Sequence, residues 1–391
     1  MSGPLSGLVV ADLTRVLAGP YCTMLLAELG ARVIKIEVPG EGDDARHMGP
    51  FVDGESMYFV SANRGKESIA LDLKAANDRA VFEAILAGSD VLIENFRPGT
   101  LDRLGYPVAQ LQERFPRLIC AAISGFGQTG PEARKPAYDL VVQGLGGIMS
   151  VTGPDGGGPV RVGTSIGDIA AGLFCTVAIN AALLHRERTG EARAIDIGML
   201  DCQLALMENA IARYTATGEI PRPLGTRHPS ATPFEAFATS DGHLIVAAGN
   251  DALFAKLCAV LGLADVAADP RFASNSLRTA NVAALRPLIA GAMALHPSAH
   301  WMEALATAGV PSAPINTVAD AIAQPQAQAR TMLVDVPLAN GQMARVAGNP
   351  MKISGFADPA SRRPAPGLDQ HRATVLADFA PGVQNAENTG G

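Results

Sequence analysis

The chain has 391 residues, a formal net charge of −7 at neutral pH and 48% hydrophobic residues. This length suffices for two domains, each with a core of its own, and the composition is typical of a soluble globular protein. A nucleic-acid-binding surface is usually basic, so the acidic balance argues against a nucleic-acid partner.

The five cysteines are far apart, include no C-x-x-C pair and lie mostly in apolar segments: Cys22, Cys120, Cys175, Cys202 and Cys258. We therefore expect reduced core residues of a cytoplasmic protein, and no metal site. The N-terminus lacks the basic and apolar regions of a signal peptide. The longest apolar run, residues 169–184, is shorter than the roughly 20 residues that cross a bilayer, which predicts a core helix and no membrane segment.

The first part of the chain alternates between strand and helix patterns. Apolar runs at residues 8–13 and 31–37 flank a helical pattern that ends at Gly30. Further strands are predicted at residues 68–73, 90–96, 118–124 and 194–197, with a helix at residues 77–86. Such alternation predicts a doubly wound α/β domain with a parallel sheet.

The first turn does not fit a nicotinamide cofactor. Glu37 ends the second strand, where an acidic residue often binds a ribose, but the turn at residues 14–20 carries one glycine. It therefore lacks the G-x-G-x-x-G pattern that lets the backbone approach a pyrophosphate.

A Gly-containing loop at residues 159–167 leads to Asp168 and then to the long apolar run. Apolar residues recur in this run at the spacing of a buried helix face: Ile169, Leu173, Val177, Ala181 and Leu184. Cations at residues 185–188 and then Gly190 indicate the C-terminus of this helix. Asp168 lies where an N-cap belongs. On spacing alone it is either a cap or a nucleophile that the helix N-terminus holds ionised.

The composition and the pattern of predicted elements change in the second half of the chain. A helix at residues 201–217 ends a large domain that begins at residue 1, and residues 218–233 form a Pro/Gly-rich linker. A smaller α+β domain follows at residues 234–309, with strands at 234–238 and 243–247 and helices at 253–261 and 299–308. A second linker at residues 310–317 returns the chain to the large domain, which takes residues 318–391. The tail after residue 357 is rich in Pro, Ala, Gly and Asn, which predicts a loosely held segment.

Several motifs occur in a specific order between about Leu5 and Gly355. They are Val16-Leu-Ala-Gly-Pro20, Val33-Ile-Lys-Ile-Glu37, Asn63-Arg-Gly-Lys66, Glu94-Asn-Phe-Arg-Pro-Gly99, Ser124-Gly-Phe-Gly127, the Gly167-Asp168 step, Arg227-His-Pro229, Ala248-Gly-Asn-Asp251 and Ala308-Gly-Val-Pro311. In this order the chain resembles the family III CoA-transferases, such as formyl-CoA and carnitine CoA-transferases, which share a superfamily with the α-methylacyl-CoA racemases.

The resemblance implies an architecture and a set of partners. It implies a Rossmann-like large domain, a smaller domain, two crossing linkers and an interlocked homodimer in which each chain threads through the other. Coenzyme A is then a substrate, and no cofactor is bound permanently. The partners are an acyl-CoA donor and a small carboxylic acid that accepts CoA.

In the resemblance, Asp168 corresponds to the catalytic aspartate. This carboxylate would attack the donor thioester to form a mixed anhydride, and the released CoA thiolate would then form an aspartyl-CoA thioester. The acceptor carboxylate would reverse these steps and leave as its own CoA ester. Such covalent catalysis divides one difficult exchange into easier ones, and with the resemblance we expect Asp168 to be the nucleophile.

The family's contacts to CoA fall on seven residues: Val16, Ala18, Leu71, Lys74, Asn95, Phe96 and Arg103. Lys74 and Arg103 suit phosphates, and Phe96 suits pantetheine or adenine. Taken singly, each fits an ordinary role as well, a solvated charge for the two cations and a core aromatic for Phe96. Val38 and Pro136 replace basic residues seen in relatives, so the contacts to the nucleotide end of CoA are expected to differ.

Four more residues are candidates for the substrate site. Gly249 and Asn250 fall where relatives have a mobile Gly-rich loop that would exclude water from the anhydride. His228 either lines the same pocket or is structural. Arg46 either holds the second carboxylate of a short dicarboxylate acceptor or forms a salt bridge.

Two other functions compete with CoA transfer. The related racemases use a His-Asp pair before the central aspartate, since proton removal and return need two acid/base groups. Here the pair is Tyr138-Asp139, so the histidine is absent, which favours transfer and leaves both residues as further catalytic candidates. A non-catalytic acyl-CoA-binding protein would not need the retained Asp168.

Overall fold

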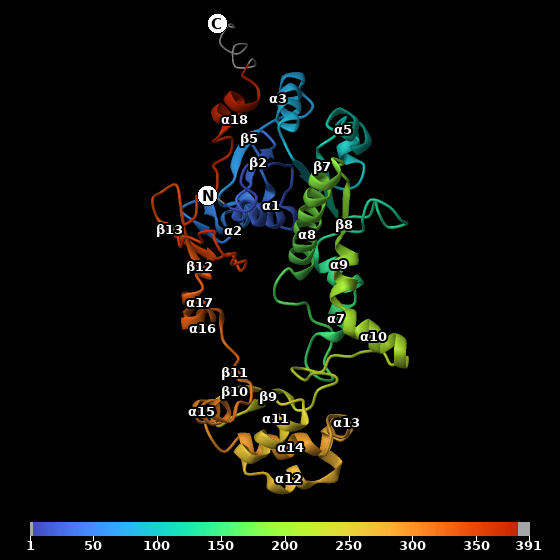
Figure 1. Cartoon of the computed structure of the whole chain (residues 1–391), viewed down its shortest axis with the longest axis vertical. Helices are drawn as coiled ribbons and strands as arrows, with labels where there is room; N and C mark the ends of the chain where they lie inside the picture. Colours follow the sequence, from blue (N-terminus) through green and yellow to red (C-terminus); the bar gives the residue numbers. More distant parts are fainter. Residues whose placement is uncertain (1–2, 382–391) are drawn as a thin grey trace. The chain divides into compact units, whose positions relative to one another are not determined.

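The computed structural model describes residues 3–381, which form two compact units (Figure 1). The larger unit combines residues up to Met149 with Arg161–Glu219 and the segment from Gln324 onward. The smaller unit combines Ser150–Val160 with Ile220–Ala323. The larger unit is therefore built from three separate stretches of the chain.

A six-stranded parallel sheet in the order β5-β2-β1-β6-β7-β8 forms the centre of the larger unit. Its strands are β1 (Val9–Asp12), β2 (Arg32–Glu37), β5 (Glu67–Ala70), β6 (Val91–Glu94), β7 (Ile119–Ser124) and β8 (Ile195–Gly198). Every neighbouring pair is parallel, so all the carboxyl ends meet at one edge of the sheet. The predicted α/β fold with a parallel sheet is confirmed.

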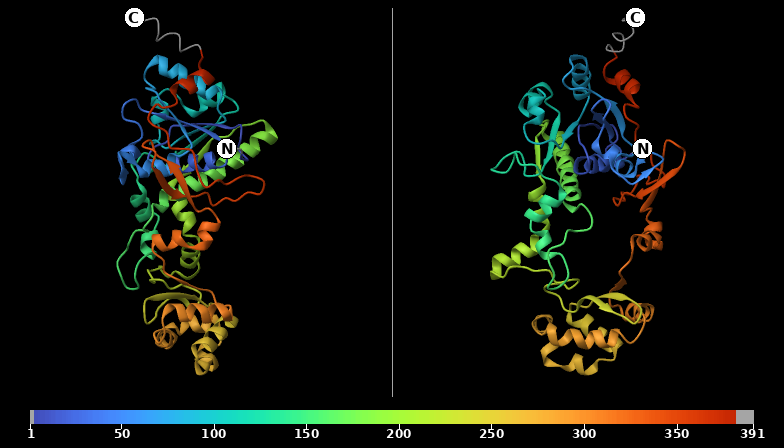
Figure 2. Two further views of the ribbon diagram at one scale, coloured as in Figure 1. Left: turned by 90° about the vertical axis from the view of Figure 1, so that its left-hand side faces the viewer. Right: turned by 180° about the vertical axis from the view of Figure 1, so that it is seen from behind.

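Helices cover both faces of this sheet (Figure 2). One face packs against α1 (Ala18–Glu28), α8 (Ile166–Thr189) and α9 (Met199–Leu206), and the other packs against α3 (Ala76–Ala87), α5 (Val108–Arg114) and α18 (Arg372–Phe379). Within β1, Val10 faces the first set of helices and Ala11 the second. Strands buried on both faces read as continuous apolar runs, which is why the sequence pattern located them.

The remaining elements of the larger unit are short. They are η1 (Asp44–His47), β3 (Phe51–Val52), β4 (Glu55–Ser56), α2 (Met57–Asn63), α4 (Thr100–Arg103), α6 (Asp139–Leu145), α7 (Ile148–Val151), α10 (Glu208–Thr217), α17 (Pro325–Ala329), β12 (Leu333–Pro337) and β13 (Met343–Ala347). The single helix predicted at residues 201–217 is instead two helices, α9 and α10, interrupted at Met207.

Helix α8 carries Asp168 and packs along α1 and β7. It begins after Ser165, so Asp168 is its third residue and the N-cap prediction is wrong. Its C-terminal cap is as predicted, because Gly190 follows in the left-handed conformation with φ 79°. Within residues 3–381, α8 is the one helix long and apolar enough to cross a membrane. Its buried side lies on α1 and the sheet, as in a core helix.

The buried face predicted for α8 is wrong for four of its five residues, because Leu173, Val177, Ala181 and Leu184 are exposed. Leu173, Val177 and Leu184 are 45%, 67% and 52% exposed. The residues that pack into the core lie on another side of the helix: Ala170, Ala171, Cys175, Ile179, Ala182 and Leu183. Since α8 is apolar on both sides, the spacing of its apolar residues does not identify the buried one.

The smaller unit joins a short antiparallel sheet to a layer of helices (Figure 2). Its strands run in the order β11-β10-β9, with β9 (Phe234–Ala238), β10 (His243–Ala247) and β11 (Ser312–Pro314). Its helices are α11 (Asp251–Leu261), α12 (Ala264–Ala268), η2 (Pro270–Phe272), α13 (Asn275–Ala280), α14 (Val282–Met293), α15 (Ser298–Ala308) and α16 (Val318–Ala323). Phe237, Leu244 and Trp301 belong to one core that is separate from those of the larger unit.

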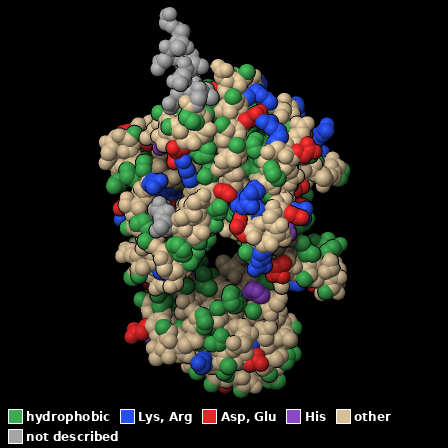
Figure 3. Space-filling view, turned by 45° about the horizontal axis from the view of Figure 1, so that its top comes forward, with side chains coloured by type: hydrophobic (Ala, Val, Ile, Leu, Met, Phe, Trp, Pro, Cys, Tyr) green, Lys and Arg blue, Asp and Glu red, His purple; other side chains and the backbone are tan. Residues whose placement is uncertain are grey.

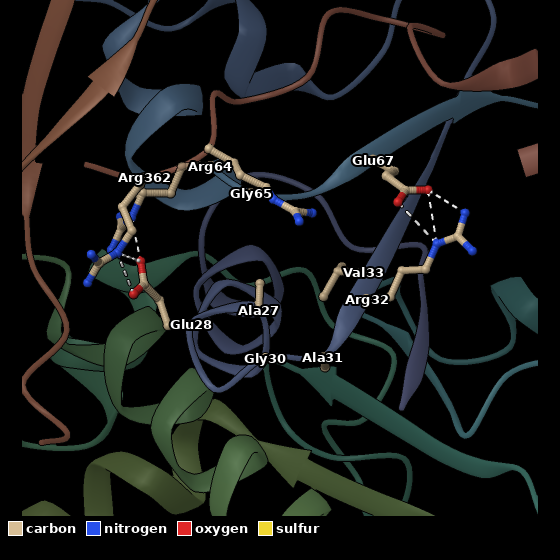
Figure 4. A pocket seen from close by; sticks show the side chains of 11 residues that line it. Ala27, Glu28, Gly30, Ala31, Arg32, Val33, Arg64, Gly65, Glu67 and Arg362 are labelled. Atoms are coloured by element: carbon tan, nitrogen blue, oxygen red, sulfur yellow. Dashed lines mark hydrogen bonds and ion pairs between the residues drawn. The ribbon is translucent and has the colours of Figure 1, made fainter. Parts of the chain in front are cut away.

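Buried charges hold the C-terminal segment to the larger unit (Figure 4). Glu28, at the end of α1, accepts hydrogen bonds of 2.8 Å from both Arg64 and Arg362, and all three side chains are at most 4% exposed. The N–H of His371 donates to the carbonyl of Ser68 in β5 at 2.9 Å. The prediction that the chain after residue 357 is loosely held is therefore wrong up to residue 381, and its remainder lies outside the described residues.

All five cysteines are buried and free, as predicted for a reduced core. On the face drawn in Figure 3, Lys and Arg side chains are interspersed with Asp and Glu side chains. Neither sign of charge dominates that face of the molecule.

Candidate active site

The carboxyl ends of β1, β6 and β7 border a cavity of about 270 Å³. Its walls are Arg15, Val16, Leu17, Ala18, Asp44, Asn95, Phe96, Arg97, Pro98, Ile123, Ser124, Gly125, Lys135, Ala137, Tyr138, Asp168 and Met199. In open α/β sheets ligands bind in such a crevice, because the loops after parallel strands converge there. The first turn of α8 brings Asp168 into this cavity.

The carboxyl of Asp168 forms no hydrogen bond or ion pair with any residue in the described range. Burial, followed by the nearby charge of Asp139, raises its pKa to about 7. The ionised form is therefore short of the hydration that stabilises a carboxylate in water. Such an unpartnered carboxylate at a cavity wall is free to react with a bound electrophile.

The residue before Asp168, Gly167, lies too close to α6 for any side chain. Its N–H donates to Asp139 Oδ1 at 2.8 Å. A Cβ at position 167 would lie 2.8 Å from a methyl carbon of Val142 and 3.0 Å from that same oxygen. Only glycine allows α6 to approach the first turn of α8 this closely.

Three further side chains surround the carboxyl of Asp168. Tyr138, the residue before α6, is 74% exposed and lines the cavity. Asp139 begins α6 and faces the N-terminus of α8 rather than lining the cavity. Burial raises the pKa of the half-buried Tyr58, and the charges of Asp168 and Asp139 raise it further, so Tyr58 lies within electrostatic reach of both.

Buried charges fix the turn between β1 and α1. Val16 has a φ of 68°, which is rare for a β-branched residue. Its N–H donates to Asp43 Oδ1 at 2.9 Å, and Lys35 Nζ lies 2.7 Å from Asp43 Oδ2. The same ammonium donates to the carbonyl of Thr14 at 2.7 Å. This anchoring places Val16 and Ala18 at the cavity wall.

Asp12 and Lys66 extend this network beneath the turn, with both side chains fully buried. Lys66 Nζ lies 3.2 Å from Asp12 Oδ2 and donates to Thr23 Oγ1 at 2.7 Å. Burial favours neutral Asp12, but the charges of Lys66 and Lys35 outweigh it and lower its pKa to about 2. Burial lowers the pKa of Lys66 to about 8, despite the attraction of Asp12.

The residues expected to contact CoA line two cavities. Val16, Ala18, Asn95 and Phe96 share the cavity of Asp168. Leu71, Lys74 and Phe96 line a second cavity of about 380 Å³ at the ends of β2 and β5. Phe96 therefore lies between the two. Arg103 lines neither, but its guanidinium donates to Thr100 at 2.8 Å, and Thr100 borders the second cavity.

Arg46, a candidate for holding an acceptor carboxylate, forms an ion pair within the chain. Its Nε and Nη2 donate to the two oxygens of Glu37, each at 2.7 Å. The guanidinium also donates to the carbonyl of Pro366 and lies 3.8 Å from the ring centre of Phe59. These contacts are those of the salt-bridge alternative, and a role of Arg46 toward an acceptor carboxylate stays a prediction.

The other three substrate-site candidates lie in the smaller unit and make local contacts there. His228 Nδ1 accepts hydrogen bonds from the N–H groups of Ser230 and Ala231. Asn250 caps α11, since its side chain accepts from the N–H of Leu253 at 2.8 Å. The carbonyl of Gly249 accepts from Arg278 at 3.3 Å. Their role toward substrate stays a prediction.

Cations at the cavity wall were not assigned a role from the sequence. Arg15 and Arg97 line the cavity, together with Lys135. Arg15 pairs with Asp44 at 2.6 Å, whereas Arg97 is exposed and forms no ion pair within the described residues. Only their position in the sequence could have indicated a role in the site, since Arg15 and Arg97 follow the carboxyl ends of β1 and β6.

A sequence model of CoA-transferase family III matches residues 5–372. The chain belongs to CoA-transferase family III. It is 48% identical to an acetyl-CoA:oxalate CoA-transferase of Acetobacter aceti, over 97% of this chain and 96% of the relative. It is 41% identical to a succinate–glutarate CoA-transferase of Agrobacterium fabrum, over 96% of each chain. It is also 41% identical to a succinyl-CoA:mesaconate CoA-transferase of Haloarcula hispanica, over 97% of this chain and 98% of that one.

Solved structures of similar proteins support the fold. A CaiB/BaiF family protein from Brucella suis is 40% identical, with a TM-score of 0.84 over 97% of this family III CoA-transferase and 100% of that chain. Rv3272 from Mycobacterium tuberculosis is 30% identical, with a TM-score of 0.86 over 96% of this chain and 99% of its own. Membership and fold therefore identify an enzyme that uses CoA thioesters as substrates.

Proposed function

We propose that this CoA-transferase carries its intermediates on Asp168 and delivers CoA to a short dicarboxylate. The observation that carries the proposal is the carboxyl of Asp168, partly buried but without a hydrogen-bond or ion-pair partner among the described residues, at the wall of the cavity that Val16, Asn95 and Phe96 share. A purely structural aspartate of this burial would be paired, because an unpaired buried charge is costly.

In the first half of the proposed cycle, an Asp168 oxygen attacks the carbonyl carbon of the donor thioester. The C–S bond breaks, CoA leaves as a thiolate and a mixed anhydride remains. The thiolate then attacks the aspartyl carbonyl, the donor acid leaves as a carboxylate and Asp168 becomes a CoA thioester. Each step exchanges one acyl bond for another, so the cycle needs no oxidant and no cofactor besides CoA.

In the second half the acceptor carboxylate attacks the aspartyl thioester and releases the thiolate. A new anhydride joins Asp168 to the acceptor, and the thiolate attacks the acceptor carbonyl. The acceptor leaves as its CoA ester, and the carboxylate of Asp168 is regenerated. We assign the pantetheine arm to the wall at Val16, Ala18 and Asn95, and the nucleotide end to the cavity of Leu71 and Lys74, with Phe96 between them and Arg103 beside it.

A dicarboxylate acceptor is supported by charge. Arg15, Arg97 and Lys135 line the cavity of Asp168, and a guanidinium suits a second carboxylate. The names of the relatives include oxalate, glutarate and mesaconate, which are dicarboxylates. The substrate pair itself is best identified by testing CoA donors against a library of mono- and dicarboxylates, with products measured by mass.

We also propose a homodimer with interlocked chains, as the family resemblance implies. Large apolar side chains exposed on α6 and α8 support an interface, including Leu140, Leu145 and Val177 at 53%, 61% and 67% exposure. Size measurement across a dilution series is expected to give one dimeric species. A native monomer that appears reversibly on dilution contradicts the interlocking.

The nucleophile is tested by trapping. With an acyl-CoA donor and hydroxylamine, the acylated Asp168 is expected to become a hydroxamate, and the enzyme loses activity; borohydride reduces the same residue to an alcohol. Peptide mass spectrometry locates either change. Neither is expected without donor, because an ionised carboxylate resists both reagents.

Asp168→Asn and Asp168→Ala are the matched variants. Both are expected to fold and to lose CoA exchange. Exchange at the wild-type rate by Asp168→Ala, or exchange by the wild type with an unmodified Asp168 peptide after trapping, disproves covalent transfer. A racemase would instead exchange the α proton with solvent deuterium without forming the trapped species.

A further inference from the structure

Gln143 is a fully buried amide beneath the first turn of α8. It lies on α6, where its Nε2 donates to Asp139 Oδ2 at 2.8 Å. Its Oε1 accepts from the N–H of Val162 at 2.9 Å, and Nε2 also lies 3.5 Å from the carbonyl of Thr164. One side chain thus joins the start of α6 to the loop that enters α8.

Asp139 completes a closed path of hydrogen bonds. Its second oxygen, Oδ1, accepts from Gly167. The path runs from the N–H of Val162 through Gln143 and Asp139 to the N–H of Gly167, and Asp168 is the next residue. The loop at residues 162–167 is therefore held at both ends by side chains of α6. The exposed Arg161 also touches both partners, since its Nε donates to the carbonyl of Val162 at 3.2 Å and its guanidinium lies 3.6 Å from Asp139, but Gln143 is the buried one of the two.

We propose that Gln143 is a positioning residue for CoA transfer, which keeps Asp139 and the loop at residues 162–167 in the one arrangement that aims Asp168 into the cavity. This inference rests on the proposed nucleophilic role of Asp168. Gln143 itself does not reach the cavity and acts through the two groups that it bonds.

The chemistry of the position calls for an amide. A donor is needed toward the carboxylate of Asp139 and an acceptor toward the N–H of Val162, and glutamine supplies both without adding charge. The alternative partner of Asp139 Oδ2 is Arg161, whose guanidinium is 3.6 Å away and half exposed. Without Gln143, Asp139 turns toward Arg161 and its bond to Gly167 is lost.

The same position controls the charge around the nucleophile. The ionisable groups around it are Asp139 on α6, Arg161 just before the loop, Tyr58 on α2, and the cavity-lining Tyr138, Arg15, Asp44, Arg97 and Lys135. Replacing Gln143 with an acid adds a carboxylate to the two already present. The pH dependence of transfer therefore reports on this position separately from its effect on folding.

The chain offers a matched control in Gln203. This glutamine, on α9, is also fully buried, and a Cβ at Gly167 would lie 3.6 Å from its Nε2. Neither atom of its amide is hydrogen bonded within the described residues. The two glutamines therefore share burial and neighbourhood and differ in bonding.

The test compares Gln143→Met with Gln203→Met. In Gln143→Met, kcat is expected to fall by about tenfold to a hundredfold, as for other small misplacements of a reacting group, while the KM for the CoA donor changes less than about threefold. The donor-dependent modification of Asp168 by hydroxylamine slows in the same proportion. Gln203→Met is expected to match the wild type in both measurements. Wild-type kcat and trapping rate in Gln143→Met disprove the positioning role.

A second variant covers the case in which Gln143→Met does not fold. This double variant, Asp139→Asn with Gln143→Glu, exchanges the carboxylate and the amide. It keeps an acceptor for the N–H of Val162 and a hydrogen bond between positions 139 and 143. The negative charge moves four residues along α6. This double variant is expected to fold, to recover part of kcat and to show a shifted pH profile. A wild-type kcat and pH profile in a folded double variant overturns the proposal.

The outcomes also separate this proposal from the one on which it rests. If Asp168→Ala is inactive and Gln143→Met has wild-type kinetics, only the positioning role is wrong. If Asp168→Ala exchanges CoA normally, the covalent mechanism is wrong, and the positioning role, which requires that nucleophile, fails with it.

Discussion

At the scale of a single residue, Asp168 is the proposed nucleophile and also an unusual acid. Its pKa of about 7 is raised by burial and then by Asp139, so protonation competes with attack at ordinary pH. In the proposed mechanism only the ionised form attacks a thioester, so the pH dependence of turnover is expected to follow the ionisation of this one carboxyl.

We predict that kcat/KM falls as the pH drops below about 7, because the fraction of ionised Asp168 falls there. Asp139→Asn removes the charge that opposes ionisation, so the acid limb is expected to move to lower pH, by roughly one unit. The measurement is a pH–rate profile for the wild type and the variant.

Glu94 supplies the control for this profile. Burial raises its pKa to about 7 as well, but it lines a different cavity. Glu94→Gln keeps the acceptor for the N–H of Phe96 and is expected to leave the acid limb in place. If the acid limb moves in Glu94→Gln and not in Asp139→Asn, the limb reports Glu94 and not Asp168, and the prediction is wrong.

At the scale of the element, the turn between β1 and α1 depends on a buried ion pair. We predict that Asp43→Ala lowers the free energy of unfolding by about 3–5 kcal/mol, because it leaves the fully buried Lys35 unpaired and frees the N–H of Val16. Asp44→Ala, the neighbouring change, removes a 53% exposed carboxylate and is expected to cost less than about 1 kcal/mol. Urea unfolding of both variants gives the comparison, and equal losses contradict it.

The elements themselves were largely predictable because buried parallel strands and core helices leave clear apolar patterns. The limits were local. Ser165 and Asp168 are both good N-caps, so the start of α8 was placed three residues late. The two apolar sides of this helix could not be told apart, because the sequence of the helix does not show which side packs on the sheet.

The positions of site residues were predictable where a sequence motif marks them. They were not predictable where a side chain's contacts are made with residues distant in the sequence. Asp168 and six of the seven expected CoA contacts do line the two cavities. The contacts of Arg46 could not be predicted because its partners, Glu37 and Pro366, lie 9 and 320 residues away. Gln143 carries no signal of its own, since a glutamine on a short helix is ordinary until its contacts are known.

At the scale of the whole molecule, Glu28 joins distant parts of the chain. We predict that Glu28→Ala lowers the free energy of unfolding by about 3–5 kcal/mol, because Arg64 and Arg362 are left buried without their shared carboxylate. Glu187→Ala removes the 63% exposed partner of Arg117 and is expected to change it by less than about 1 kcal/mol. Thermal unfolding at fixed pH distinguishes them, and a neutral Glu28→Ala rules out the role of Glu28 as a tie.

The assembly of the larger unit from three stretches has a consequence for synthesis on the ribosome. All six strands of its sheet have been synthesised once residue 198 is made, but β5 is bonded to His371 and Asp369, and α18 completes the core against that face. The smaller unit is made in between, from Ile220 onward, and has a core of its own. The nascent chain therefore completes its second unit before its first. Ribosome-bound chains long enough to expose Ala323 but not Asp369 are expected to protect the smaller unit from protease while β5 is still cleaved. Protection of β5 at that length would show that the larger unit closes without its last stretch.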